Sequence, residues 1–366
     1  MPTLRKIVVQ DFRNIELQEL EFSPNVNCIS GGNGEGKTNL LDAIWYLSMT
    51  KSALAASDQY LYRHGSRSFA VSGLYDMPGG MTTRFSVQAS ADAKKVRKDD
   101  KAYARVSDHI GVLPIVMVSP ADTAMVSESG EERRRFVNVV LSQMDAEYLS
   151  ALQQYNRVLQ QRNKLLKSGI TDDGLLATFD IQLARFADPV FRRREGFSKA
   201  LAPVVNEYYA QISGGRESVG IEYRSDLHKA SLEELLKAGR ERDIALKYTA
   251  SGVQRDDFIF TMDGHPIRRC GSQGQQKSFL VALKFAQYEL MKQSYGYAPI
   301  LLLDDLFDKL DTTRVSNLLQ MVSGTDFGQI FLTDSNKVRI RQTVDAITAD
   351  RTYFETEGGV FRRIDE

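Results

Sequence analysis

The first 120 residues carry apolar positions that either alternate with polar ones or form short unbroken runs, a pattern typical of β-strands. Strands are expected at residues 7–9, 20–22, 26–29, 69–71, 83–87 and 115–118. Between Leu40 and Leu47 the apolar residues recur at helical spacing instead, so a helix is expected there. The chain therefore opens with a strand-rich segment that contains one early helix.

After Pro120 the spacing of apolar residues changes to steps of three and four, which is typical of amphipathic helices. The new spacing predicts a helical insert over residues 121–246. Pro189 and Pro203 lie inside the insert. We expect them to end or kink individual helices, because proline lacks a backbone donor and clashes with the preceding turn.

A mixed pattern returns beyond residue 248. A strong helix is expected at 279–290, and strands at 258–262, 300–303, 329–333, 353–355 and 360–361. The predicted organisation is an N-terminal head part (1–120), a helical insert (121–246) and a C-terminal head part (247–366). No heptad pattern runs long enough to predict an extended coiled coil.

Composition narrows the class of protein. The length of 366 residues suggests about two domains, and the formal net charge of +0 argues against a basic nucleic-acid coat. Cys28 and Cys270 are far apart and lack metal-type spacing, which indicates a reducing interior. The opening residues contain no signal-peptide core, and no run approaches the roughly 20 apolar residues of a membrane span. A cytoplasmic protein without a membrane partner is expected.

The segment from Gly31 to Thr38 matches the phosphate-binding loop pattern G-x-x-x-x-G-K-[ST] without departure. An expected strand precedes it and an expected helix follows, so its backbone amides and the positive helix end can cradle phosphate oxygens. Lys37 is expected to reach the β and γ phosphates and Thr38 to bind Mg²⁺. The expected nucleotide-binding residues are Gly31, Gly32, Asn33, Gly34, Glu35, Gly36, Lys37, Thr38 and Asn39.

A second candidate segment, residues 299–305, is an apolar run that ends in Asp304 and Asp305. Such a pair also occurs where a strand simply meets solvent. Together with a phosphate-binding loop, however, it predicts that Asp304 binds Mg²⁺, directly or through water. Asp305 would orient and deprotonate the attacking water, so Asp305 and Lys37 are the expected catalytic residues.

The third candidate segment is Ser-Gln-Gly-Gln-Gln at residues 272–276, just before the strong helix. Its hydroxyl and amides at a helix N-terminus favour an anion, although Ser272 as a plain helix cap is the simpler alternative. One chain does not need two phosphate cradles for one nucleotide. Ser272, Gly274 and Gln275 are therefore expected to act across a dimer, on ATP held by the loop of a second copy.

These three segments, in this order, resemble the signature of ATP-binding-cassette ATPases, and residues 9–14 and 33–44 resemble its SMC/RecF branch. Within that branch, several stretches resemble the RecF family: 133–136, 161–166, 255–257, 272–277 and 303–306. The chain departs from the family pattern at Gln254, where a histidine is usual, and at residues 51–55, which lack a common arginine.

The resemblance implies an α/β fold: an ABC-type P-loop ATPase head, with a mixed sheet, flanking helices and an antiparallel β subdomain, plus an inserted α-helical arm. It also implies ATP and Mg²⁺ as cofactors, and an ATP-dependent homodimer on single- and double-stranded DNA. The implied role is DNA repair at single-stranded gaps and their junctions with duplex DNA, where the protein would act with RecR and RecO to load RecA. Asp305 replaces the glutamate of most transport cassettes, so we expect slow hydrolysis. Asp311 lies where related heads communicate across the dimer, or is a plain helix-start carboxylate.

Basic side chains gather in several places that could contact DNA. The candidates on the insert are Arg133, Arg134, Arg135, Arg157 and Lys164. A second group, Lys94, Lys95, Arg97, Lys98 and Lys101, crowds an expected hairpin of the head. Charged helix faces are often only solvated, so this alternative stays open for each group.

Two other classes of protein share the nucleotide motifs. A transport-type cassette subunit would drive a membrane partner, but the opening run at residues 12–14 and the arginine-rich insert argue against it. A non-hydrolysing clamp would use ATP binding for assembly alone, and DNA-stimulated phosphate release would distinguish an ATPase from it. An SMC-like tether is excluded because the insert cannot supply a long coiled coil.

Overall fold

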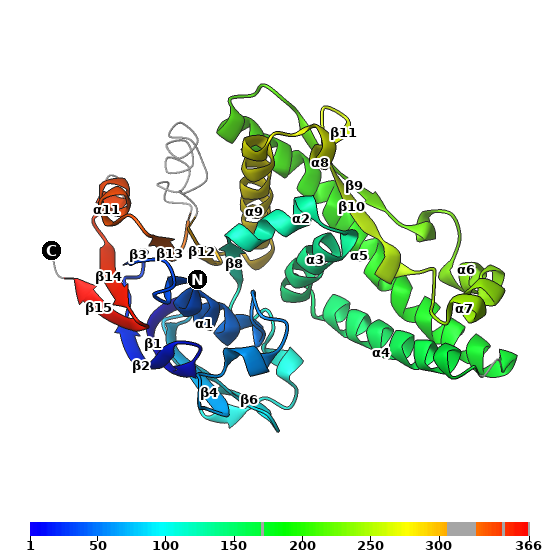
Figure 1. Ribbon diagram of the computed structural model, residues 1–366, viewed down its shortest axis with the longest axis horizontal. Helices are drawn as coiled ribbons and strands as arrows, with labels where there is room; N and C mark the ends of the chain where they lie inside the picture. Colours follow the sequence, from blue (N-terminus) through cyan, green and yellow to red (C-terminus); the bar gives the residue numbers. More distant parts are fainter. Residues whose placement is uncertain (170–171, 306–326, 346–347, 365–366) are drawn as a thin grey trace. The chain divides into compact units, whose positions relative to one another are not determined.

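The computed structural model describes residues 1–169, 172–305, 327–345 and 348–364 (Figure 1). The chain forms two compact units. We call residues 1–123, 208–216 and 273–366 the head, and residues 124–207 and 217–272 the arm. Asp311, which the sequence suggested as a contact between heads, lies outside the described residues.

The centre of the head is a six-stranded, mostly parallel sheet with the order β15-β14-β3-β13-β12-β8. Its strands are β3 (Val26–Ser30), β8 (Ile115–Val118), β12 (Ile300–Leu303), β13 (Ile330–Asp334), β14 (Arg351–Glu357) and β15 (Val360–Ile364). β3, β8, β12 and β13 are buried along their whole length. Strands covered on both faces are expected to be continuously apolar, which explains the unbroken runs in the sequence.

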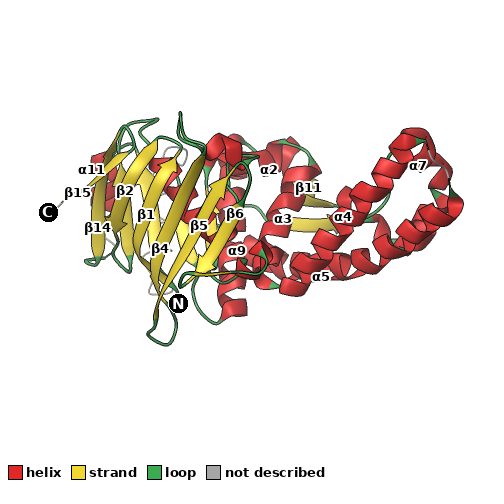
Figure 2. Ribbon diagram, turned by 90° about the horizontal axis from the view of Figure 1, so that it is seen from below, coloured by secondary structure: helices red, strands yellow, loops and turns green. Residues whose placement is uncertain are grey.

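The second sheet of the head is antiparallel, with the order β2-β1-β4-β5-β6-β7 (Figure 2). Its strands are β1 (Thr3–Phe12), β2 (Ile15–Glu21), β4 (Ser68–Asp76), β5 (Thr82–Ser90), β6 (Lys94–Lys98) and β7 (Lys101–Ala102). In β4 and β5 buried residues alternate with more exposed ones, as expected for a sheet with one covered face.

Within the described part of the head, the helices α1 (Lys37–Met49), α9 (Gln273–Tyr295) and α11 (Lys337–Asp345) accompany these sheets. α1 contacts strands of both sheets, β1 and β4 on one side and β8 and β13 on the other. Leu40, Leu41, Ile44 and Leu47 are accordingly fully buried, and these are the residues whose spacing predicted the helix. Short 3₁₀ turns cover Asp58–Leu61, Val106–His109 and Pro120–Thr123.

The arm consists of helices and a small sheet. Its helices are α2 (Ala124–Ser127), α3 (Gly130–Met144), α4 (Ala146–Ser168), α5 (Asp173–Ser213, which ends in the head), α6 (Leu232–Ala238), α7 (Arg240–Leu246) and α8 (Ile267–Cys270). Strands β9 (Val219–Arg224), β10 (Asp257–Met262) and β11 (His265–Pro266) form an antiparallel sheet of order β11-β10-β9. Asp145 caps α4 by accepting from the Glu147 and Tyr148 amides. None of the helices in the described ranges combines the length and apolar character that a membrane crossing requires.

The structure differs from the sequence-based expectations in the arm. The predicted insert was helical throughout, but β9 lies inside it and pairs with β10. That pairing joins residues 247–272 to the arm, although the sequence suggested that the head resumes at 247. Neither Pro189 nor Pro203 ends a helix, because both lie inside α5. A continuous buried stripe outweighs the cost of each proline, about 3 kcal/mol. The stripe consists of Leu176, Leu183, Ala187, Val190, Leu201, Val205 and Tyr209.

Candidate nucleotide site

The glycine-rich loop lies between the end of β3 and the start of α1, as its sequence predicted. At two positions of the loop any side chain would be strained or would displace a neighbour. A Cβ on Gly31 would lie 2.5 Å from the Thr356 carbonyl oxygen. Gly36 has a φ of 108°, in the region that favours glycine, and a Cβ there would lie 2.9 Å from the Asn14 side chain. The loop therefore fits closely against β14 and the β1–β2 turn.

Lys37 is 4% exposed, and its ammonium group folds back over the loop. Its Nζ donates to the carbonyl oxygens of Gly31 (2.8 Å) and Gly32 (2.9 Å). An ammonium group carries three donors, so one more is available to a ligand. The arrangement holds a positive charge at the rim of the loop.

The acidic pair meets the loop at Thr38. The Thr38 hydroxyl donates to the Asp304 carboxylate and lies 3.0 Å from each of its oxygens. Thr333, at the end of β13, donates to Asp304 Oδ1 (2.8 Å) and accepts from the Asp305 amide (3.0 Å). Burial raises the pKa of Asp304, while the bonds from Thr333 and Thr38 oppose that rise. The sequence did not suggest Thr333, whose only signal was its place at the end of a buried strand.

A pocket of about 250 Å³ joins these groups. Its lining residues are Asn33, Gly34, Gly36, Lys37, Thr38, Asn39 and Asp305. Glu35 instead points to the terminal hairpin, where its carboxylate accepts from the Gly358 amide. Gly274 and Gln275 are not among the residues that line this pocket in the described part of the chain. Ser272 is exposed, immediately before α9.

A larger neighbouring pocket of about 610 Å³ shares Asn39 with the first. Arg13, Asn14, Tyr60, Tyr62, Arg63 and His64 complete its lining. The sequence singled out Arg13 and Asn14 only as part of the family-like run 9–14 and did not place them or the other residues at a site, because no motif spacing connects the β1–β2 turn to the segment before β4. Arg13 is held in place by Asp42, which is fully buried and 3.1 Å away. Asp42 also accepts from the Ser52 hydroxyl (2.6 Å), which fixes the segment lacking the family arginine.

Two of the five arginine and lysine candidates on the arm are engaged within the arm itself. Arg133 forms a two-pronged pair with Asp257, at 2.8 and 3.0 Å, and Arg134 donates to the Asp256 carbonyl oxygen at 2.6 Å. Burial favours a higher pKa for Asp257, but the bonds and charge of Arg133 outweigh it and hold that pKa below the usual value. These contacts make the two arginines part of the α3–β10 packing and argue against their assignment to DNA.

The other three candidates, Arg135, Arg157 and Lys164, have exposed side chains. Arg157 and Lys164 both lie on α4, seven residues apart, and therefore share one face of the helix. Gln254, which replaces the family histidine, donates to the Thr249 (3.2 Å) and Ser251 (3.0 Å) carbonyl oxygens. Gln254 thus holds a turn of the arm through neutral hydrogen bonds.

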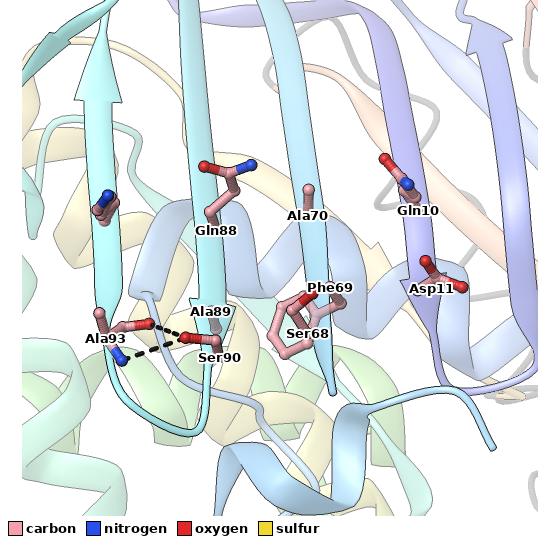
Figure 3. A pocket seen from close by; sticks show the side chains of 10 residues that line it. Gln10, Asp11, Ser68, Phe69, Ala70, Gln88, Ala89, Ser90 and Ala93 are labelled. Atoms are coloured by element: carbon pink, nitrogen blue, oxygen red, sulfur yellow. Dashed lines mark hydrogen bonds between the residues drawn. The ribbon is translucent and has the colours of Figure 1, made fainter. Parts of the chain in front are cut away.

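The outer face of the antiparallel sheet is polar. Gln10, Ala70, Gln88 and Lys95 are neighbours across β1, β4, β5 and β6. Figure 3 shows the Gln10 and Gln88 side chains on this face with Ala70 between them, beside a hollow of about 290 Å³. On the adjoining hairpin, Lys95, Lys98 and Lys101 are exposed, whereas Lys94 donates to the Thr50 carbonyl oxygen and pairs with Asp58.

The order of strands, the loop between β3 and α1 and the carboxylates after β12 define an ATP-binding-cassette ATPase head of the SMC/RecF type. A family model, the RecF/RecN/SMC N terminal domain, matches residues 3–351. The fold is also that of a Smc head domain from Pyrococcus furiosus. The TM-score is 0.58 at 14% identity, with 100% of this chain and 96% of that chain covered.

The chain belongs to the RecF family. It is 41% identical to the DNA replication and repair protein RecF of Bacteroides fragilis over 365 residues, which cover 99% of both chains. It is 42% identical to the RecF of Parabacteroides distasonis over 363 residues, which cover 99% of this chain and 100% of that one. The structure of the recombination mediator protein RecF with ATP, of the RecFOR pathway, matches with a TM-score of 0.89 and 28% identity. That match covers 100% of this chain and 98% of the other. The predicted family and fold class are thus confirmed.

Proposed function

We propose that the protein binds ATP with Mg²⁺ in the loop pocket and hydrolyses it slowly, as a switch for assembly on DNA. The observation that carries this proposal is the contact of the Thr38 hydroxyl with the Asp304 carboxylate at 3.0 Å, across 266 positions of sequence. It joins the phosphate-binding loop to the acidic pair in one site. The ATP-bound RecF structure, which covers the whole chain, supports the same ligand.

The donor set fits Mg²⁺, because that ion prefers hydroxyl, carboxylate and phosphate oxygens. Thr38 and Asp304 would hold it, and burial of Asp304 makes an added positive charge favourable there. When bound, Mg²⁺ would neutralise charge on the phosphate oxygens. Lys37 would contact the β and γ phosphates, while the amides of residues 31–36 surround them. Asp305, which lines the pocket, would orient the attacking water and accept its proton.

The neighbouring pocket would take the base and ribose. Arg13, Tyr60, Tyr62 and His64 line it, and planar guanidinium and aromatic groups stack favourably on bases. Asn39 belongs to both pockets, so the two subsites are continuous. This assignment gives the nucleotide one extended site along the start of α1.

ATP would also hold two copies of the chain together. Ser272 is exposed at the start of α9, and Gly274 and Gln275 follow it outside the described lining of the loop pocket. Placed over the γ phosphate of a partner's ATP, the amides and the hydroxyl at this helix start would complete the site. The dimer would then form with ATP and separate after hydrolysis.

The DNA-binding role would fall to two basic groups, whose side chains are exposed except for the half-buried Arg97. One is Arg135, Arg157 and Lys164 of the arm, and the other is Lys95, Arg97, Lys98 and Lys101 beside the polar sheet face. Dimerisation would double each group, so DNA affinity should depend on ATP. The RecF relatives act in DNA replication and repair, and one belongs to the RecFOR pathway. By analogy, the protein would act at gaps and junctions in the cytoplasm, with RecR and RecO, to load RecA.

The test is phosphate release and DNA binding by the full chain and a Lys37→Met variant. We expect slow, DNA-stimulated release by the wild type and a loss of at least about 100-fold in the variant. Release as fast as in a transport cassette would contradict the timing role. ATP binding without any phosphate release, even with DNA, would favour the non-hydrolysing clamp.

DNA binding has its own controls. With ATP, log affinity should fall with log salt at a slope of about −0.9 per phosphate neutralised. Replacing Arg135, Arg157 and Lys164 by glutamine should reduce that slope, and so should the same change at Lys95, Arg97 and Lys98. Lys199→Met, which removes an exposed lysine paired with Glu195, is the matched control. Equal binding by the Lys37→Met variant would rule out the coupling to ATP.

A further inference from the structure

α9 begins at the Ser272–Gln276 segment and carries a nearly buried charge three turns along. Lys284 Nζ lies 2.9 Å from Asp122 Oδ1, and the two side chains are 11% and 16% exposed. Lys284 is eleven residues from the first residue of α9, about 17 Å along the helix. The pair therefore ties the middle of α9 to the short turn at Pro120–Thr123.

From Asp122, a series of contacts continues to the acidic pair. Asp122 Oδ2 accepts from the Ser119 amide at 2.7 Å, which fixes the residue directly after β8. The last residue of β8, Val118, accepts from the Asp304 amide at 2.9 Å. Lys284 is thus joined to the Asp304 backbone through one ion pair, one turn and the end of one strand.

A small cavity of about 50 Å³ marks the same contact region. Its lining residues include Ser119, Asp122, Lys277, Asp304 and Asp305. The two carboxylates, residues of α9 and residues of the turn therefore border one common cavity.

We infer that the Lys284–Asp122 ion pair is a positioning pair that couples the two ATP sites of the dimer. This inference rests on the proposed function, in which the start of α9 contacts the partner's ATP and Asp304 and Asp305 act on the chain's own. A shift of α9 on engaging the partner's nucleotide would move Lys284, because a helix transmits displacement along its axis as a rigid rod. Asp122, Ser119 and β8 would follow, and the Asp304–Asp305 segment would adjust.

The charges matter to this role, beyond simple packing. A nearly buried ion pair has a narrow energy minimum, since the surrounding protein screens it less than water does. Replacing one charge leaves the helix packed but loosens its link to the turn. Nucleotide binding to each separate chain, which uses the loop and α1, should be unaffected.

The test uses the full chain with Lys284→Met, and Asp122→Asn as a second variant that can still accept from Ser119. We measure binding of a fluorescent ATP analogue to the monomer, ATP-dependent dimerisation by sedimentation, and hydrolysis over a range of ATP concentrations. We expect unchanged analogue binding, dimers that still form, a Hill coefficient reduced to 1, and a turnover rate about 10-fold lower. Lys284→Arg keeps the charge and should restore cooperativity, and Lys199→Met should leave every readout unchanged.

Suppose that both variants keep the Hill coefficient of the wild type and differ from it only in melting temperature. That result would show that the pair is purely structural and would overturn the inference. Loss of analogue binding by both variants would also overturn it, because the pair would then serve the chain's own site. A wild-type chain that neither dimerises with ATP nor hydrolyses it would instead contradict the proposed function. The measurements on the wild-type chain therefore test the proposed function, and the measurements on the variants test the inference.

Discussion

Replacing Arg162 by methionine should destabilise the arm strongly. The Arg162 side chain is fully buried in α4 and pairs with Asp180 at 2.8 Å and Asp243 at 2.7 Å. It also donates to the Thr249 hydroxyl at 2.8 Å. Methionine would fill part of the space but leave the Asp180 and Asp243 carboxylates inside the arm without this partner. Removing one member of a buried pair costs about 3–5 kcal/mol.

That cost should lower the melting temperature of a unit of this size by about 10 °C. Far-UV circular dichroism at 222 nm would follow the helices of the arm. The single tryptophan, Trp45, lies in α1 of the head and is 7% exposed, so its fluorescence would follow the head separately. We expect the dichroism transition to shift further than the tryptophan transition.

Arg157→Met is the matched control, because Arg157 lies on the same helix with an exposed side chain. It should melt within a degree or two of the wild type, as surface substitutions generally do. An Arg162→Met variant as stable as the wild type would refute the reasoning, since the pairs would then contribute nothing net. An equal loss in both variants would show that helix propensity, not the buried charge, decides the result.

Three further predictions concern the head. Thr333→Val should lower turnover about 10-fold with ATP binding retained, because it removes the hydroxyl that bonds both Asp304 and the Asp305 amide. Leaving such buried partners unsatisfied costs about 1–3 kcal/mol. Thr333→Ser should restore turnover, and full activity of the valine variant would contradict the assignment. Gly31→Ala should abolish ATP binding in calorimetry, because the new Cβ would meet the Thr356 carbonyl; normal affinity would show that the loop can shift. Burial lowers the pKa of His109, so the unfolded chain takes up a proton there that the folded chain does not. The free energy of unfolding is therefore not reduced by His109 above about pH 6.5. Below that pH it falls, by about 1 kcal/mol at pH 5.5. Urea unfolding at pH 7 and 5.5 should show this loss in the wild type and not in His109→Gln, and equal losses would exclude His109 as the cause.

The loop and the acidic pair could be predicted because their chemistry is local. Each is a short run whose residue types suit phosphate or Mg²⁺, and each follows a buried strand. Their meeting at Thr38 and Asp304 followed from that chemistry, although 266 positions separate them. The residues of the neighbouring pocket, such as Arg13 and Tyr60, come from a turn and a 3₁₀ segment with no periodic signal. Only the folded chain brings them together.

The DNA-binding role predicted from runs of basic residues is least reliable where the fold pairs an arginine with a distant carboxylate. Arg133 and Arg134 belong to a run of three arginines that suggested a DNA surface, yet both bond to the Asp256–Asp257 segment. A sequence shows the arginine but not the distant carboxylate that will face it. β9 was missed for a similar reason. It is a six-residue strand amid helical spacing, and its partner β10 lies more than 30 residues later.

The central claim is that each ATP site is shared between two copies of the chain. It is tested most directly by mixing a Lys37→Ala chain with a Ser272→Arg chain and measuring phosphate release with DNA. Each variant alone should be inactive. A mixed dimer contains one site with an intact Lys37 from one copy and an intact Ser272 from the other, so activity should rise clearly above the sum of the separate variants. Mixtures no more active than that sum would contradict the account, because each chain would then have to complete its own site.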